Sequence, residues 1–160
     1  MKQVGTFGCK LVEVTGGEPL AQPAAFRLVN HLCDENYEVL VETGGFFSTE
    51  NLDHRAKVIL DVKCPASGEE NRNHWPNLDR LRADRDEVKF VVANRNDWDF
   101  ARETVERYKL EERAKAVLIS PAWDTVELSD LANWIKDSRL NIRMQLQLHK
   151  YIWGADARGV

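Results

Sequence analysis

The chain has 160 residues, of which 43% are hydrophobic and 30% are charged, and its formal net charge is −4. This length and balance are typical of one soluble globular domain with a sizeable core. No apolar run reaches the roughly 20 residues needed to cross a bilayer, and the acidic balance weighs against a nucleic-acid partner. The first ten residues lack the apolar centre of a secretory signal, so we expect a cytoplasmic protein that binds small molecules.

Strand patterns alternate with helix patterns along the chain. Lys10–Gly17 is predicted as a strand, Pro19–Cys33 as a helix that begins on a proline, and Tyr37–Gly45 as a second strand. The remaining predicted elements are a strand at Lys57–Pro65, a polar loop at Ala66–Asn77, a strand at Asp86–Asn94, a helix at Asp97–Leu110 capped by Asp97, a strand at Ala116–Trp123, a helix at Thr125–Ser138 and a long final strand at Asn141–Trp153. This alternation predicts parallel strands joined by crossover helices. Without an internal linker or repeat, residues 1–160 are expected to form a single domain.

Polar side chains gather at the carboxyl ends of the predicted strands. Residues two apart in a strand share a face, so Glu13 is placed beside Thr15, and Glu42 beside Leu40. The same spacing groups Asp61 with Lys63, Leu118 with Ser120, and Arg143 with Gln145, Gln147 and His149. Helices normally cover the outer face of a parallel sheet, and α/β barrels place their sites at the carboxyl ends of the strands. This favours a shared polar mouth, with a solvated rim as the alternative.

The residues of this mouth differ in chemistry. Lys63 and Lys89 are cations, and Glu42 and Asp61 are acids. The neutral donors or acceptors are Thr15, Ser120, Gln147 and His149. Such a set suits a zwitterionic or heteroaromatic ligand better than a phosphate. Neither a G-x-G-x-x-G fingerprint nor a G-x-x-x-x-G-K-[ST] phosphate loop occurs in the chain.

The first predicted strand ends on two glycines, in the stretch VEVTGGEPLAQ. Gly16 and Gly17 would let the backbone approach a ligand where a Cβ would clash, and the exposed peptide groups could bind an amine and a carboxylate. An ordinary strand-to-helix turn explains the spacing equally well.

This stretch resembles the GGEP motif of radical S-adenosylmethionine enzymes. Further segments follow in order: VETGG (Val41–Gly45), LDVKCPASGE (Leu60–Glu69), DEVKFVV (Asp86–Val92), LISP (Leu118–Pro121) and QLQLHKYIWG, with RGV at the end. Together they are similar to the 7-carboxy-7-deazaguanine synthase family, over Gly8–Val160.

The resemblance implies an α/β fold, an incomplete (β/α) TIM-like barrel of about six mostly parallel strands that lacks the first βα unit. It implies a lyase of queuosine and 7-deazapurine biosynthesis, which contracts the ring of 6-carboxy-5,6,7,8-tetrahydropterin to 7-carboxy-7-deazaguanine and releases ammonia. Its implied cofactors are S-adenosylmethionine, a [4Fe–4S] cluster and Mg²⁺, and its implied assembly is a homodimer. The cofactors carry out the difficult chemical steps, and the protein binds and orients the cofactors and the substrate.

The resemblance also carries over to individual residues. The residues expected to bind S-adenosylmethionine are Gly16, Gly17, Glu18, Lys63, Ser67 and Ser120. Those expected to bind the pterin are Thr15, Glu42, Gln147 and His149, with Glu42 as the catalytic residue, whose carboxylate suits a guanine-like N–H pair. The carboxyl-terminal tail is expected to close over the substrate.

One departure from the family matters. The family holds its cluster on a CxxxCxxC-type loop after the first strand, with a Thr or Ser for Mg²⁺, and this sequence has neither. Cys9, Cys33 and Cys64 are widely spaced, so we expect them not to converge on a cluster and assign no metal ligand. We expect this chain alone to be inactive. It is expected to be a fragment, with two alternatives: a cluster-free, non-catalytic relative that binds ligand, or a partner polypeptide that supplies the cysteines.

Overall fold

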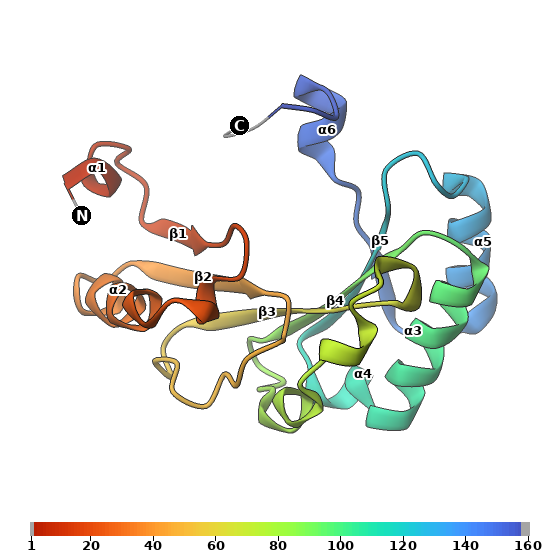
Figure 1. Ribbon diagram of the computed structural model, residues 1–160, viewed down its shortest axis with the longest axis horizontal. Coiled ribbons are helices and arrows are strands. Elements are labelled where there is room, and N and C mark those ends of the chain that lie inside the picture. The colour runs from red at the N-terminus through yellow and green to blue at the C-terminus, as the bar shows by residue number, and fades with distance from the viewer. Residues whose placement is uncertain (1, 158–160) are drawn as a thin grey trace.

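Six parallel strands form one curved sheet in the computed structural model, which describes residues 2–157 (Figure 1). The strands are β1 (Leu11–Val14), β2 (Glu38–Thr43), β3 (Lys57–Val62), β4 (Glu87–Val92), β5 (Ala116–Pro121) and β6 (Ile142–Met144). Each strand pairs with the next one in the chain, which leaves β1 and β6 at opposite edges. This arrangement is an open portion of a (β/α) barrel, and it confirms the expected fold class.

Helices line the outer side of the sheet (Figure 1). They are α2 (Pro23–Asp34), α3 (Arg95–Tyr108), α4 (Leu110–Arg113) and α5 (Leu128–Ser138). Two shorter helices, α1 (Lys2–Gly5) and α6 (Leu148–Trp153), stand at opposite ends of the sheet, toward its open side. Short 3₁₀ helices lie at Pro19–Ala21, Pro65–Ser67, Glu70–Arg72 and Trp75–Arg80. None of the helices described between residues 2 and 157 combines the length and apolar character that a membrane crossing requires.

The core lies between the sheet and its outer helices. In β2 and β4 every second residue is buried, so Val39 and Val41 pack with α2, while Val88, Phe90 and Val92 belong to the cluster of α3. Two clusters result, one beneath each helix, and Leu52 packs against both. The intervening residues of the same strands point to the concave face, which is where the polar side chains predicted from the alternation lie.

Two predicted helix starts change in the structure. The segment after β1 is a 3₁₀ helix at Pro19–Ala21, and α2 begins only at Pro23, because a second proline is placed where a first helical turn tolerates it. The cap of α3 is Asn94, whose side chain accepts a hydrogen bond from the Asp97 amide at 3.0 Å. Asp97 is buried within the helix and accepts from the amides of Ala66 and Ala93.

The prediction of a long final strand is wrong. β6 covers only Ile142–Met144, and the chain then turns into α6. Its last ladder contact is the Gln145 amide donating to the Ile119 carbonyl at 2.9 Å. Among residues 2–157 β6 pairs with β5 alone, and this pairing stops at Met144, opposite Ile119, before β5 ends at Pro121. The whole RGV motif, Arg158–Val160, lies outside the described residues, and so does the predicted closure by the tail.

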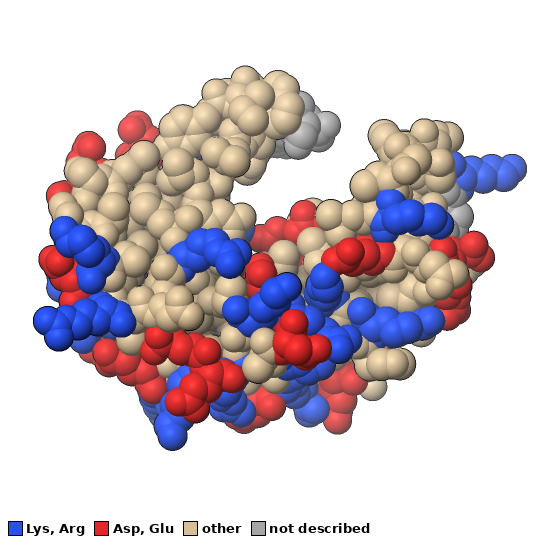
Figure 2. Space-filling view, turned by 180° about the vertical axis from the view of Figure 1, so that it is seen from behind, with Lys and Arg blue, Asp and Glu red and all other residues tan. Residues whose placement is uncertain are grey.

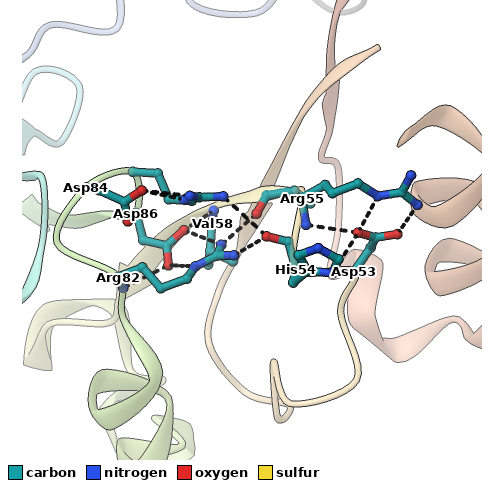
Figure 3. A network of polar contacts seen from close by, with 9 residues as sticks. Asp53, His54, Arg55, Val58, Arg82, Asp84 and Asp86 are labelled. Atoms are coloured by element: carbon teal, nitrogen blue, oxygen red, sulfur yellow. Dashed lines mark hydrogen bonds and ion pairs between the residues drawn. The ribbon is translucent and has the colours of Figure 1, made fainter. Parts of the chain in front are cut away.

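A network of ion pairs joins the amino ends of β3 and β4 (Figure 3). The Asp86 carboxylate is 2% exposed and accepts from the Val58 amide at 2.9 Å. It also accepts from the Arg82 amide at 3.0 Å and from Arg82 Nε and Nη2, each at 2.7 Å. Arg82 in turn donates to the carbonyls of His54 and Ala56. One buried carboxylate therefore organises both strand starts.

Replacing Gly45 with alanine should destabilise the turn after β2. Gly45 has φ +70°, and an added Cβ would lie 2.9 Å from Cδ1 of the buried Leu60. We expect the free energy of unfolding to fall by about 2–4 kcal/mol. About 1 kcal/mol of this comes from placing alanine in the left-handed conformation, and the rest comes from overpacking against Leu60. Urea unfolding followed by circular dichroism measures the loss.

Gly68 offers a matched control for this substitution. It has φ +71° but no heavy atom within 4 Å of an added Cβ, so Gly68→Ala should lose only the conformational part. Equal losses in the two variants would show that the contact with Leu60 contributes nothing.

Candidate functional site

The turn after β1 is fixed to the end of β2 by the Glu18 carboxylate. One oxygen accepts from the Leu20 amide at 3.0 Å and from Thr43 Oγ1 at 2.7 Å, and the other accepts from the Gly44 amide at 2.9 Å. The space is tight, since a Cβ on Gly44 would lie 3.2 Å from Glu18 Oε2. Because both oxygens already bind protein groups, Glu18 positions the turn.

Gly16 and Gly17 are needed for their backbone conformation. Their φ angles are +89° and +57°, a region that side-chain-bearing residues rarely adopt. An added Cβ at either position would have no heavy atom within 4 Å, so in this structure no close neighbour requires glycine. Both residues are exposed, so a ligand could reach their peptide groups.

A cavity of about 550 Å³ opens on the concave face of the sheet. Figure 2 shows, from behind, a hollow between the segment that carries α6 and the segment that carries α1. The polar residues that line the cavity are Glu13, Glu42, Glu87, Lys89, Ser120, Gln145, Gln147 and His149. The cavity therefore brings together four predicted site residues: Glu42 from β2, Ser120 from β5, and Gln147 and His149 from the segment after β6.

An ion pair crosses the floor of this cavity. Lys89 Nζ lies 2.6 Å from Glu42 Oε1, and the two side chains are 17% and 25% exposed. The two residues belong to β4 and β2, so the contact spans β3, where Ile59 is the register partner of both Glu42 and Glu87. Ser120, on β5, is buried at the same cavity.

The other predicted site residues lie beyond the strand ends, outside the lining of this cavity. Thr15 is exposed directly after β1, beside Gly16 and Gly17. Lys63 follows β3, where its ammonium group pairs with Asp61 at 2.7 Å and its backbone is held on both sides by Asn73. The second oxygen of Asp61 is buried and has no hydrogen-bond partner among the residues that the structure describes.

Ser67 is engaged within its own 3₁₀ helix. Its hydroxyl donates to the Cys64 carbonyl at 2.6 Å and accepts from the Glu69 amide at 3.1 Å. Lys63 and Ser67 thus share the carboxyl end of β3 and are separate from the cavity that holds Glu42.

Sequence reasoning missed two aromatic residues and one acid near the site. Trp123 and Tyr151 contact each other edge to face, with ring centroids 5.0 Å apart, and line a second cavity of about 350 Å³. Gln147 borders both cavities, and its Oε1 is buried with no hydrogen-bond partner within residues 2–157. The missed acid is Glu13, which strand alternation had already placed on the face of Thr15.

Burial changes the acidity of several groups. It raises the pKa of Glu13, and the neighbouring charge of Glu42 raises that pKa further, whereas Lys89 lowers it. Burial likewise raises the pKa of the Cys33 and Cys64 thiols, so both are poor thiolate donors.

The three cysteines do not form a cluster site. Cys9 is exposed, Cys33 belongs to the core cluster beneath α2, and Cys64 belongs to the cluster beneath α3. Over residues 2–157, no group of three or more His, Cys, Asp or Glu side chains could hold a metal ion. The described thiols therefore do not fit a [4Fe–4S] cluster.

Comparison with known proteins gives the family. No protein-family model matches the chain. The chain is 41% identical over 162 residues to the 7-carboxy-7-deazaguanine synthase of Chlorobaculum tepidum, covering 100% of this chain and 73% of that protein. It is 40% identical over 163 residues to the 7-carboxy-7-deazaguanine synthase of Koribacter versatilis, covering 94% of this chain and 72% of that protein.

A solved structure shares the fold. It is a domain of a pyruvate-formate lyase-activating enzyme from Bacteroides vulgatus, with a TM-score of 0.64 and 17% identity, and the match covers 84% of this chain and 98% of that domain. At this identity the likeness supports the architecture alone. The two synthases, which align over all or nearly all of this chain, show that it belongs to the 7-carboxy-7-deazaguanine synthase family.

Proposed function

We propose that this chain binds 6-carboxy-5,6,7,8-tetrahydropterin in the concave cavity, as the substrate-binding part of a synthase that forms 7-carboxy-7-deazaguanine and releases ammonia. The observation that carries the proposal is the meeting of Glu42, Ser120, Gln147 and His149 around one cavity. Relatives of 34–41% identity that bear the synthase name support a catalytic family over a non-catalytic relative.

Glu42 is the residue proposed to hold the reacting ring. A carboxylate accepts two parallel N–H bonds from an amino-pyrimidinone edge, and Lys89 at 2.6 Å compensates its charge once water is expelled. Gln147 and His149 lie across the cavity, where they can donate to the ligand's carboxylate. Thr15, beyond the end of β1, is proposed to border the same ligand.

S-adenosylmethionine is proposed to bind over the turn after β1. The exposed peptide groups of Gly16 and Gly17 can bind its amine and carboxylate, while Glu18 keeps the turn in place. Lys63, Ser67 and Ser120 remain the proposed contacts of the rest of the cofactor. When bound and reduced through a [4Fe–4S] cluster, this cofactor supplies a radical that abstracts hydrogen. We assign no residue of this chain to the cluster or to Mg²⁺.

Titration of this chain with 6-carboxypterin tests the proposal. This oxidised analogue keeps the amino-pyrimidinone edge and the carboxylate, and it is stable in air. Isothermal titration calorimetry should give a dissociation constant of about 1–100 μM, within the usual range for enzyme substrates. Heats no larger than those for benzoate would contradict the assignment of the cavity.

The chain alone is proposed not to cleave S-adenosylmethionine reductively. Its thiols lie in separate parts of the fold, and a cluster needs several thiolates at one point. Anaerobic reconstitution with iron and sulfide should therefore leave the absorbance near 400 nm at background and yield no 5′-deoxyadenosine. Formation of that product, with dithionite as the reductant, would refute the proposal.

We propose that the chain self-associates through the edge of β1. Within the described residues β1 pairs only with β2, and Phe7 and Leu11 beside this edge are 75% and 50% exposed. Light scattering at tens of micromolar should report a mass above 18.4 kDa, the mass of one chain. Leu11→Lys should restore the monomer, whereas the control Leu28→Lys, on α2, should not; a monomeric wild-type chain would contradict the proposal.

A further inference from the structure

Glu13 is an acid of the cavity to which the proposed function gives no role. It lies on β1 opposite Leu40 of β2, and it therefore shares the concave face with Glu42, one pleat further along the neighbouring strand. Both side chains line the same cavity, with Glu42 half-buried and Glu13 exposed. The described residues provide no ion pair to Glu13, because Lys89 is bound to Glu42.

The charges around Glu13 are unbalanced. The groups that face it across the cavity are Glu42 from β2, Glu87 and Lys89 from β4, and His149 from α6, while Asp61 on β3 is paired with Lys63. Among the described residues, the lining of the cavity thus holds three carboxylates (Glu13, Glu42 and Glu87) and one lysine, which pairs with Glu42. Burial and the charge of Glu42 both raise the pKa of Glu13, as expected for an acid without a cation of its own.

The proposed ligand has more donors than Glu42 can accept. An amino-pyrimidinone edge carries three N–H hydrogens, one on the ring nitrogen and two on the exocyclic amine. A single carboxylate accepts two of them side by side, and the remaining amine hydrogen then points away from it. A donor that gives up water without gaining an acceptor weakens binding, so a second acceptor beside Glu42 would strengthen it.

We propose that Glu13 accepts this remaining amine hydrogen, and that the carboxylates of Glu13 and Glu42 together select ligands with a 2-amino group over those with a 2-oxo group. This inference rests on the proposed function of the cavity. A 2-oxo ligand would bring a carbonyl oxygen against a carboxylate, which adds repulsion to the loss of a hydrogen bond.

The role of Glu13 has a pH signature. The amine hydrogen is accepted best by the ionised carboxylate, and protonation of Glu13 competes with the ligand. Since the pKa of Glu13 is raised above its usual 4.5 in the empty cavity, affinity for the 2-amino ligand should fall as the pH is lowered through that raised pKa. Affinity for the 2-oxo ligand should rise as the pH is lowered, or stay unchanged.

Calorimetric titration with 6-carboxypterin and 6-carboxylumazine, which differ in the 2-amino and 2-oxo groups, tests the inference at pH 5 to 7.5. In Glu13→Leu the preference for the pterin should fall roughly tenfold, the effect of one charge-assisted hydrogen bond. Glu13→Gln keeps an acceptor without the charge, so its preference for the pterin should lie between those of the wild-type chain and Glu13→Leu. The control Glu103→Gln removes a charge from the exposed face of α3 and should keep the full preference.

Each outcome decides the matter. A preference that falls in Glu13→Leu, together with a flatter pH profile for the pterin, supports the inference. Proportionate losses for both ligands, or an unchanged preference, overturn the role of Glu13 and leave the proposed function standing. Wild-type chain that binds neither ligand overturns the proposed function, and the role of Glu13 with it.

Discussion

Replacing Asp86 with alanine is expected to lower the free energy of unfolding by about 3–5 kcal/mol, the usual cost of breaking a buried ion pair by removing one partner. The Asp86 carboxylate is 2% exposed and accepts hydrogen bonds from the Val58 amide, from the Arg82 amide and from the Arg82 guanidinium. Its removal leaves the Val58 amide without its acceptor and the Arg82 guanidinium without its counter-charge, at the start of β3 and β4 (Figure 3). Urea unfolding at pH 7 measures the loss.

Asp84 provides the matched control. It carries the same charge two residues away and pairs with Arg85 at 2.7 Å, but its side chain is 63% exposed. Asp84→Ala should therefore lose less than about 1 kcal/mol, the value of a surface pair. The loss for Asp86→Asn should lie between those for Asp84→Ala and Asp86→Ala, because the amide oxygen can still accept from the Val58 amide. Similar losses for Asp84→Ala and Asp86→Ala would show that the network contributes by charge alone and not by its buried hydrogen bonds.

The open barrel could be predicted from the sequence because local pattern and global fold agree. Apolar alternation in Glu38–Thr43 and Glu87–Val92 specified two half-buried strands, and it also placed Glu42 and Lys89 on the same face. In a parallel sheet the carboxyl ends of all strands lie at the same edge, so the polar residues near these ends come together. The alternation thus led to both the core and the cavity.

The parts that were missed depend on contacts that no local pattern reports. Asn141–Trp153 alternates as a strand should, yet its pairing stops at Met144, opposite Ile119 and before β5 ends at Pro121, and α6 follows. The N-cap of α3 is Asn94 and not the predicted Asp97, because the Asp97 carboxylate accepts hydrogen bonds from the amides of Ala66 and Ala93. The ion pair between Glu42 and Lys89 depends on the strand register, which the sequence does not specify.

Replacing Glu42 with leucine is expected to weaken the binding of 6-carboxypterin at least 100-fold. The variant loses two charge-assisted hydrogen bonds to the ligand, each worth about 1.5–3 kcal/mol, and it leaves Lys89 without its partner at 2.6 Å. Both side chains are partly exposed to the cavity, so the fold should persist, which a circular dichroism spectrum checks. Calorimetric titration at pH 7 gives the affinity.

Lys89→Met separates the ligand contact from the ion pair. This variant keeps the Glu42 carboxylate but leaves it beside Glu13 and Glu87 without a cation, and we expect a loss of about tenfold in affinity. If Lys89 acts only through Glu42, the double variant should bind no worse than Glu42→Leu alone, so that the two losses do not add. Additive losses would instead mean that Lys89 contacts the ligand directly. The cavity would then hold a cation for the ligand's carboxylate or carbonyl, and the pterin would lie with its edge reversed.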